Sequence, residues 1–172
     1  FAAEEDQLGT LNLTTGAFTA TSATFGSGNG DAGLVNFDDI DGLAIDPLSG
    51  ELYGTQRQTG GDDDILIKID KTTGAHVPAA FSGGDDYVVI SGTGVLEDID
   101  DIAIDPSDGT MYAASNDGGN GGVLITINMM TGAASVNGQF GVDDMEGLAF
   151  FTDGQLYGST GEFSDLTTVN RL

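Results

Sequence analysis

The sequence of 172 residues lacks cysteine, has only three prolines, and has four basic residues against 28 acidic ones. The absence of cysteine excludes a disulfide framework and thiolate chemistry. The net charge of −24 argues against nucleic acid as a partner, because a phosphate backbone is bound by Lys and Arg. It also argues against an anionic membrane surface, and no apolar run is long enough for membrane insertion.

The chain also lacks the patterns of a helical or a disordered protein. Apolar residues make up 39% of it and stand in short, regular runs, so we expect it to fold. They almost never recur at the spacing of an amphipathic helix. The 28 glycines fit short strands joined by tight turns. We therefore predict a single all-β domain over residues 1–172.

An internal repeat organises the sequence. The segment D-D-I-D-G-L-A-I-D-P at 38–47 recurs as E-D-I-D-D-I-A-I-D-P at 97–106 and as D-D-M-E-G-L-A-F at 143–150. The centre of the segment is apolar on both faces of a strand, so we expect each copy to form an inner strand that is covered on both sides.

Further runs follow each copy in the same order. A run that contains Leu-Tyr or Met-Tyr lies at 50–54, 109–113 and 154–158. A third run, in which apolar residues alternate with period two, precedes the Thr-Gly pairs at Gly74 and Gly132, and a fourth run leads out of each pair. Four short antiparallel strands in roughly 40–50 residues are typical of one blade of a β-propeller.

We therefore predict a propeller-like array of four-stranded antiparallel blades, with two full blades and partial blades at each end. The predicted blade parts cover about 4–23, 36–82, 95–140 and 142–172. Leu8 to Leu13 and Ala17 to Ala23 match a third and a fourth strand with no first or second strand before them. Leu166 to Val169 matches a third strand. Three alternatives follow for the unfinished blades. The N-terminal strands complete the last blade within one chain, another copy of the chain completes it, or the chain is a fragment.

The pattern D-I-x-G-L-A-x-D-P, G-x-L-Y, I-D-x-x-T-G resembles the propeller repeats of secreted and cell-surface bacterial proteins, including large adhesin-like ones. The resemblance covers nearly the whole chain and implies the architecture. It implies an extracellular or cell-surface location as well, but propellers have many unrelated activities.

Paired carboxylates open each copy of the repeat. The two members of a pair stand at i and i+2, so in an extended strand both point to one side. In a propeller the first strand lines the central axis, where converging carboxylates repel one another unless a hard cation lies among them. The resemblance to propellers with an axial Ca²⁺ agrees, so we predict a calcium site. Its predicted ligands are Asp39, Asp41, Asp98, Asp100, Asp144 and Glu146. The alternative is a solvated acidic rim, or Asp residues that cap turns.

Other polar features have simpler interpretations. The acidic loops at 62–64, 85–86 and 116–120 match no established calcium loop, and we interpret them as turns. Asn12 begins an N-glycosylation triplet. A single histidine, His76, lies on a fourth-strand run, where a structural role is expected.

Three tyrosines repeat with the second run, at Tyr53, Tyr112 and Tyr157. We expect them to pack between blades with their hydroxyl groups at the edge. The alternative is an aromatic surface that binds sugar or peptide.

The chain is not expected to be an enzyme, because no nucleophile with an adjacent base can be assembled and the glycine-rich segments carry acids instead of Lys. We predict a non-catalytic extracellular structural or adhesive protein, stabilised by Ca²⁺ and joined to itself as an oligomer or filament, or to other parts of a larger surface protein. One alternative is a calcium-dependent module that binds glycan or peptide. A third is a calcium-dependent lactonase or esterase.

Overall fold

The computed structural model describes residues 2–4, 6–58, 63–92, 94, 98–116, 121–142 and 144–161. The prediction of an all-β protein is confirmed: in these ranges there is no α-helix, and helical structure is limited to the 3₁₀ turn Ser82–Gly84. Within the same ranges no helix has the length and apolar character needed to cross a membrane. The strands of the described residues form separate antiparallel sheets, none of which is closed.

Two sheets have four strands each, paired in chain order. The strands of the first are β6 (Ile40–Ile45), β7 (Leu52–Gln56), β8 (Ile65–Ile69) and β9 (Tyr87–Val89). The strands of the second are β10 (Asp98–Ile104), β11 (Met111–Asn116), β12 (Val123–Ile127) and β13 (Ala134–Gln139).

The remaining strands form three smaller sheets. They are the N-terminal sheet of β1 (Ala2–Glu4), β2 (Gln7–Leu11) and β3 (Phe18–Thr24), the hairpin of β4 (Ser27–Gly30) and β5 (Gly33–Asn36), and the hairpin of β14 (Met145–Phe150) and β15 (Leu156–Thr160).

The three copies of the sequence repeat form hairpins with one register. Ala44 pairs with Tyr53, Ala103 with Tyr112, and Ala149 with Tyr157. Each hairpin also has a register shift in its first strand, between Ile40 and Leu43, between Ile99 and Asp101, and between Met145 and Gly147. A bulge changes the direction of a side chain and often borders a functional site. Here each bulge contains the second carboxylate of a predicted pair, namely Asp41, Asp100 or Glu146.

Other Asp residues of the repeat cap the turns between strands. The carboxylates of Asp46, Asp70 and Asp105 accept hydrogen bonds from the backbone two residues later. Hydrogen bonds lower the pKa of each group, and the largest contributions come from the hydroxyl of Ser49 for Asp46, the backbone N–H of Thr73 for Asp70 and the hydroxyl of Ser107 for Asp105. Gly50, Gly74 and Gly109 close these turns with positive φ angles, which glycine adopts without steric cost. For these residues the turn-capping interpretation of the acidic composition holds.

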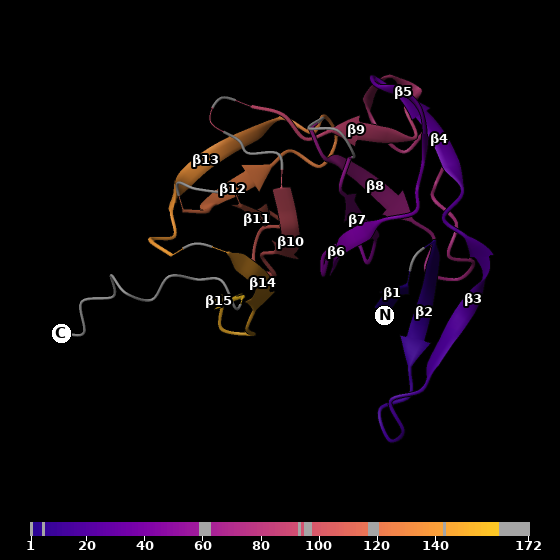
Figure 1. Ribbon diagram of the computed structural model, residues 1–172, viewed down its shortest axis with the longest axis horizontal. Helices are drawn as coiled ribbons and strands as arrows, with labels where there is room; N and C mark the ends of the chain where they lie inside the picture. The colour runs from indigo at the N-terminus through magenta and orange to yellow at the C-terminus, as the bar shows by residue number, and fades with distance from the viewer. Residues whose placement is uncertain are drawn as a thin grey trace.

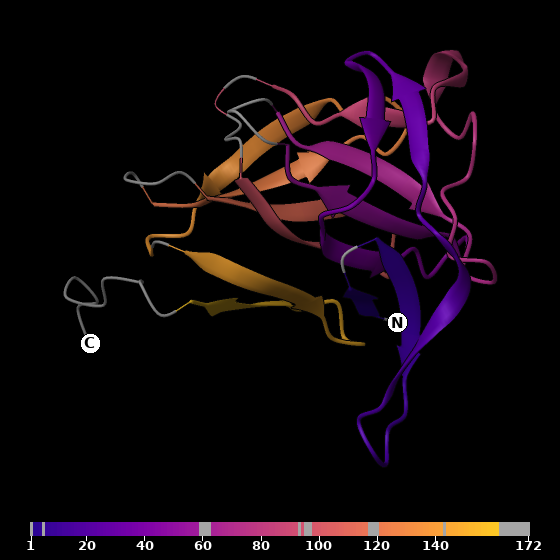
Figure 2. The ribbon, with the colours of Figure 1, turned by 45° about the vertical axis from the view of Figure 1, so that its right-hand side comes forward.

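Figure 1 shows the sheets in an arc, with β14 and β15 at one end and the N-terminal sheet at the other. The first strands lie side by side, because β10 contacts both β6 and β14, and Figure 2 shows the same neighbours from another side. One apolar cluster joins the two four-stranded sheets and includes Leu66, Ile99 and Ile125. A second cluster joins the N-terminal sheet to the first four-stranded sheet and includes Leu8 and Phe25.

The structure corrects the predicted strands at two places. β2 and β3 form as predicted, but β1 precedes them and pairs with β2, where no earlier strand was expected. The fourth strand of the first sheet was predicted to begin at Gly74, whereas β9 takes that place and ends at Val89. The strand predicted at 166–169 lies outside the described residues.

The contacts of the residues after Gly74 explain the displaced fourth strand. After the Thr-Gly turn the chain makes only an isolated bridge from His76 to Ile69. The backbone N–H of His76 is 3.1 Å from the carbonyl oxygen of Phe25, so it bonds to the chain beyond β3. Pro78 follows and has no N–H to continue a ladder. The first sheet therefore extends beyond residue 82, the predicted end of its blade.

Candidate functional site

The candidate site lies where the first strands of the three repeat hairpins meet. Asp41 belongs to β6, Asp98 and Asp100 belong to β10, and Glu146 belongs to β14. Asp39 and Asp144 stand just before β6 and β14. Because these strands are neighbours, the sequence repeat brings carboxylates from three hairpins to one end of the sheets.

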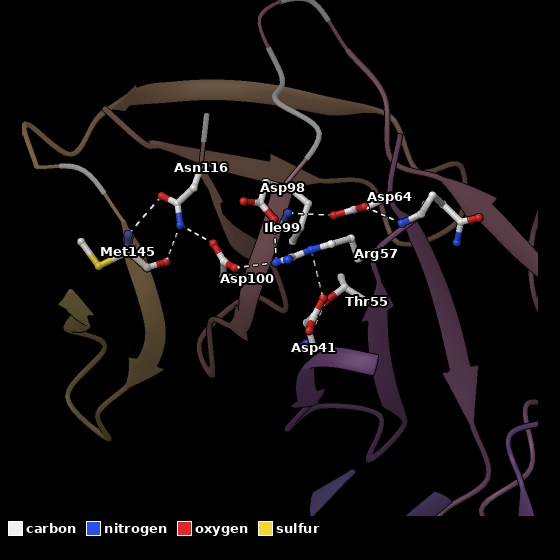
Figure 3. Close-up of polar contacts among 11 residues, drawn as sticks. Asp41, Thr55, Arg57, Asp64, Asp98, Ile99, Asp100, Asn116 and Met145 are labelled. Carbon is white, nitrogen blue, oxygen red and sulfur yellow. Dashed lines mark hydrogen bonds and ion pairs between the residues drawn. The ribbon is translucent and has the colours of Figure 1, made fainter. Parts of the chain in front are cut away.

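Arg57, the residue after β7, lies among three of the predicted carboxylates (Figure 3). Its Nη2 atom is 2.6 Å from Oδ1 of Asp98 and 3.0 Å from Oδ1 of Asp100, and its Nε atom is 3.6 Å from Oδ2 of Asp41. Partial burial opposes the charge of Arg57, but the charges of Asp98, Asp41 and Asp100 outweigh it and raise the pKa of the guanidinium. Arg57 therefore joins β6 of the first sheet to β10 of the second.

Asn116 continues this network to the third hairpin. Its amide nitrogen donates a hydrogen bond to the carboxylate of Asp100 and another, 3.0 Å long, to the carbonyl oxygen of Met145. Its amide oxygen accepts a hydrogen bond of 3.0 Å from the backbone N–H of Met145. Asn116 is buried, and its amide nitrogen and amide oxygen both bond to the backbone of Met145 at the start of β14 (Figure 3).

Asp64 forms a second link between the two four-stranded sheets. It is 1% exposed and comes just before β8. Its two carboxylate oxygens accept hydrogen bonds from the backbone N–H of Ile99 at 2.8 Å and of Gln58 at 3.1 Å. Burial raises the pKa of Asp64 to about 6, although both hydrogen bonds oppose this shift.

Asp101 forms the corresponding link on the other side of β10. One of its carboxylate oxygens accepts a hydrogen bond of 2.7 Å from the backbone N–H of Leu148 in β14, and the other accepts one of 2.9 Å from Ile102. Burial raises the pKa of Asp101. Gly42 and Gly147 stand at this position in the other two hairpins and have no such side chain.

The remaining predicted carboxylates lie apart from Arg57 in their contacts. Glu146 is exposed and shares a hydrogen bond with Asp144, which raises the pKa of Glu146. Asp144 has a φ angle of +64°, which is uncommon for a residue other than glycine. Asp39 is exposed and acts on the site through its charge, which contributes to the raised pKa of Asp41.

The charge balance of the site is strongly negative. Burial raises the pKa of Asp41 from 3.8 to about 6 against the opposing effect of Arg57. Burial likewise raises the pKa of Asp100. One guanidinium therefore faces several carboxylates, and a proton bound by Asp41 or Asp100 would relieve part of the repulsion between them.

The oxygen donors suit calcium chemically, but the arrangement does not fit the predicted centre. Ca²⁺ takes about six to eight oxygen ligands, and in the described residues no group of three or more acidic or histidine side chains is placed to hold a metal. The space between Asp41, Asp98 and Asp100 contains the guanidinium of Arg57. The guanidinium thus fills the space that a calcium ion shared by these three residues would need, whereas calcium at Asp39, Asp144 and Glu146 stays a prediction.

Arg57 and Asn116 were missed by sequence reasoning, which followed the repeated residues only. Both directly follow the residue that pairs with Ile40 or Ile99, and Gly161 holds the same place after the partner of Met145. An alignment of the three copies would have shown Arg, Asn and Gly at one position beside paired carboxylates. That variation is the signal that could have identified them.

The other predicted features lie away from this network. The Nδ1 atom of His76 is 2.8 Å from the carbonyl oxygen of Phe25, and the imidazole ring packs edge-on against Phe37. Asn12 is exposed in the turn between β2 and β3, and its glycosylation stays a prediction. Of the acidic loops, Asp62 and residues 117–120 lie outside the described ranges, and Asp86 accepts hydrogen bonds from Asn29 and Ala79.

The three repeated tyrosines differ in their surroundings. Tyr53 is buried, and its hydroxyl donates a hydrogen bond of 3.0 Å to Glu51. The ring of Tyr112 lies 5.7 Å from that of Phe150 in β14. These two pack between sheets as expected, whereas Tyr157 is exposed.

No protein-family model matches the sequence, and no curated protein and no solved structure is significantly similar to it.

Proposed function

We propose that this chain is a non-catalytic repeat module of the propeller type, which serves as a structural or adhesive part of an extracellular or cell-surface protein. The observation that carries the proposal is the repetition of one hairpin, with one register and one bulge, in three neighbouring positions. Repeats that bury their faces against one another form scaffolds that can be extended by adding units.

The polar residues at the meeting point of the hairpins support a structural role. Arg57, Asp64, Asn116 and Asp101 each connect the first strand of one sheet with a neighbouring sheet, through an ion pair or a backbone hydrogen bond. Groups that must bind and release a substrate need free donors or acceptors, whereas these are used within the fold. Rigid connection of adjacent units is the property that a structural module requires.

Self-assembly by strand complementation is the second part of the proposal. The hairpin of β14 and β15 has the register of an inner pair of strands, and β2 with β3 has that of an outer pair. In the second sheet Thr126 pairs with Ser135, and in the N-terminal sheet Thr10 pairs with Thr19 at the matching place. The inner pair of one copy and the outer pair of another would therefore make one four-stranded unit.

The known sheets give the expected register of this assembly. Tyr112 in β11 pairs with Thr126 in β12, so Tyr157 in β15 should pair with Thr10 in β2 of a second copy. In the structure β1 pairs with β2, with Ala2 opposite Gly9, and thus covers part of this edge. Assembly would require β1 to give way.

Disulfide cross-linking tests the assembly directly, because the chain has no cysteine of its own. Thr10→Cys and Tyr157→Cys are prepared as separate proteins, mixed and oxidised. Directly opposed residues of antiparallel strands are close enough for a disulfide, so a linked pair of chains is expected on a non-reducing gel. Deletion of residues 1–5 should increase its yield, since the edge of β2 is then free.

Controls separate this outcome from its rivals. Thr19→Cys, which lies on β3, mixed with Tyr157→Cys should not cross-link. A third protein carries both Thr10→Cys and Tyr157→Cys, and a link within one chain of it would indicate closure inside a single copy. Absence of any link, together with a monomer in sedimentation velocity at high concentration, would contradict self-assembly.

The calcium prediction at Asp144 and Glu146 is tested in the same material. Sedimentation and thermal unfolding are compared in millimolar Ca²⁺ and in EDTA, with Asp144→Asn combined with Glu146→Gln as the variant. A calcium effect that this variant removes would support the prediction. No effect in the wild type would contradict the calcium prediction and leave the proposal of a repeat scaffold unaffected.

A further inference from the structure

In each repeat hairpin, the position directly after the residue that pairs with Ile40, Ile99 or Met145 is occupied by residues of decreasing reach. In the first hairpin it is Arg57, whose guanidinium lies within 3.6 Å of carboxylate oxygens of Asp41, Asp98 and Asp100. In the second it is Asn116, whose amide contacts Asp100 and the backbone of Met145. In the third it is Gly161, which has no side chain. Only the first hairpin thus has a positive charge at this position.

We infer that Arg57 is a counter-ion supplied by the chain itself, which holds Asp41, Asp98 and Asp100 together and takes the place of a divalent cation between the two four-stranded sheets. This inference stands independently of the proposed function, because it concerns how the sheets are joined. It also differs from the expectation of an axial calcium ion at these three residues.

The geometry of the guanidinium supports this assignment. Two of its nitrogens contact carboxylates from two different strands, Nε on the side of β6 and Nη2 on the side of β10. A planar fork with fixed donors suits such bridging better than a point charge does. Arg57 is also anchored by its place at the end of β7, which pairs with β6.

A calcium ion in the same space would be unfavourable. Calcium lies about 2.3–2.6 Å from its oxygen ligands, which are the oxygens that the guanidinium already contacts. The ion and the guanidinium would then repel each other at close range. Calcium and Arg57 are therefore alternatives at this centre, and the presence of Arg57 should make it insensitive to calcium.

The first test measures calcium binding and thermal unfolding of the full chain. In isothermal titration, the Asp98→Asn and Asp100→Asn variants should bind calcium no less than the wild type does. Each substitution should change the unfolding temperature by the same amount in Ca²⁺ as in EDTA. Calcium binding that either substitution abolishes while Arg57 is intact would overturn the inference.

The second test removes the guanidinium and offers replacements. Arg57→Ala should lower the unfolding temperature by about 5 °C, because it leaves the carboxylates without their counter-ion. Free guanidinium ion at tens of millimolar should restore part of the lost unfolding temperature, and so should millimolar calcium. Tetramethylammonium at the same ionic strength should restore less. Equal recovery with all three cations would indicate general screening and overturn the inference.

A matched control and a second variant complete the design. Lys71→Ala removes one positive charge at an exposed turn, where Lys71 donates to the carbonyl oxygen of Gly50, and it should show no rescue by guanidinium. If Arg57→Ala does not fold, Arg57→Lys decides: it keeps the charge but loses the fork. It should unfold at a lower temperature than the wild type and remain insensitive to calcium. A calcium-dependent unfolding temperature in Arg57→Lys, or wild-type stability in it, would contradict the proposal.

Discussion

The interface between the first and second four-stranded sheets differs from the interface between the second sheet and the hairpin of β14 and β15. At the first interface, buried apolar side chains of both sheets pack into one cluster. At the second interface, Met145 alone is buried among the residues of β14 and β15, and Tyr157 is exposed. Since each fully buried aliphatic side chain contributes about 1.5–3 kcal/mol, the first interface is expected to be the more stable.

The polar contacts of the two interfaces also differ, and among them only Arg57 and Asn116 stand at equivalent positions. Arg57 and Asp64 join the first pair of sheets, whereas Asn116 and Asp101 join the second pair. Gly122 stands where the second sheet would have the counterpart of Asp64. The comparison shows that one backbone repeat can be connected by different side chains. The N–H groups of Ile99 and Met145 hold the same place in their hairpins, but the first donates to Asp64 and the second to Asn116.

The largest expected effect is at the first interface, in Asp64→Ala. This change leaves the buried N–H group of Ile99 and the partly buried N–H group of Gln58 without their acceptor, and the loss at a buried group costs about 1–3 kcal/mol. It also removes a buried charge that was itself unfavourable, so we expect a net loss of about 2–3 kcal/mol in urea unfolding. Asp63→Ala, an exposed neighbour, should change stability by less than about 0.5 kcal/mol. Equal effects of the two variants would contradict this account.

At the second interface Asn116→Ala should cost about 2 kcal/mol, since the backbone N–H and C=O of Met145 lose their partner. Hydrogen exchange should sharpen the comparison between interfaces. Amides of β14 and β15 should exchange faster in this variant, while those of β7 and β8 should be unchanged. Asn137→Ala on the exposed face of β13 is the control. Uniformly faster exchange would mean that the two interfaces are not separable.

Stability at the first interface should rise on mild acidification. The pKa of Asp41 and of Asp64 is raised from 3.8 to about 6 in the folded chain, so the folded state binds protons more tightly than the unfolded one. The free energy of unfolding should therefore increase as the pH falls from about 7 towards 4. Asp41→Asn should reduce this increase, and urea unfolding at several pH values measures it. A stability that falls steadily from pH 7 to pH 5 would contradict the prediction.

The smallest effect is expected at the turn after β6, away from the carboxylates of the candidate site. Asp46→Ala removes the acceptor for the N–H of Leu48 and for the hydroxyl of Ser49, which should cost about 1 kcal/mol. Urea unfolding should show this loss without any change in the exchange of β14 and β15. A loss as large as that of Asp64→Ala would mean that turn capping dominates the stability of the fold.

The repeat allowed much of the fold to be predicted. The alternation of Ile65, Ile67 and Ile69 predicted a strand, and the three copies of the first segment predicted three first strands. β1 was not predicted, because its three residues have no periodicity. The displaced β9 could not be predicted either, since it depends on contacts of the chain after Gly74 with the chain beyond β3.

The candidate site was predicted in position but not in composition. The recurrence of Asp41, Asp100 and Glu146 was enough to indicate that carboxylates would converge. It gave no information on the cation, because Arg57 lies outside the repeated residues and reaches the adjacent sheet only through the fold.

The sequence by itself therefore determined local structure: the strands, the turns capped by Asp and Gly, and the carboxylate at each bulge. These follow from side-chain period, backbone freedom and hydrogen bonds between residues a few positions apart, all of which are local. Only the tertiary structure decided which charge balances those carboxylates and how well each hairpin is covered. Such properties depend on distances between residues far apart in the chain, such as the 2.6 Å between Arg57 and Asp98, and a linear pattern contains no information on them.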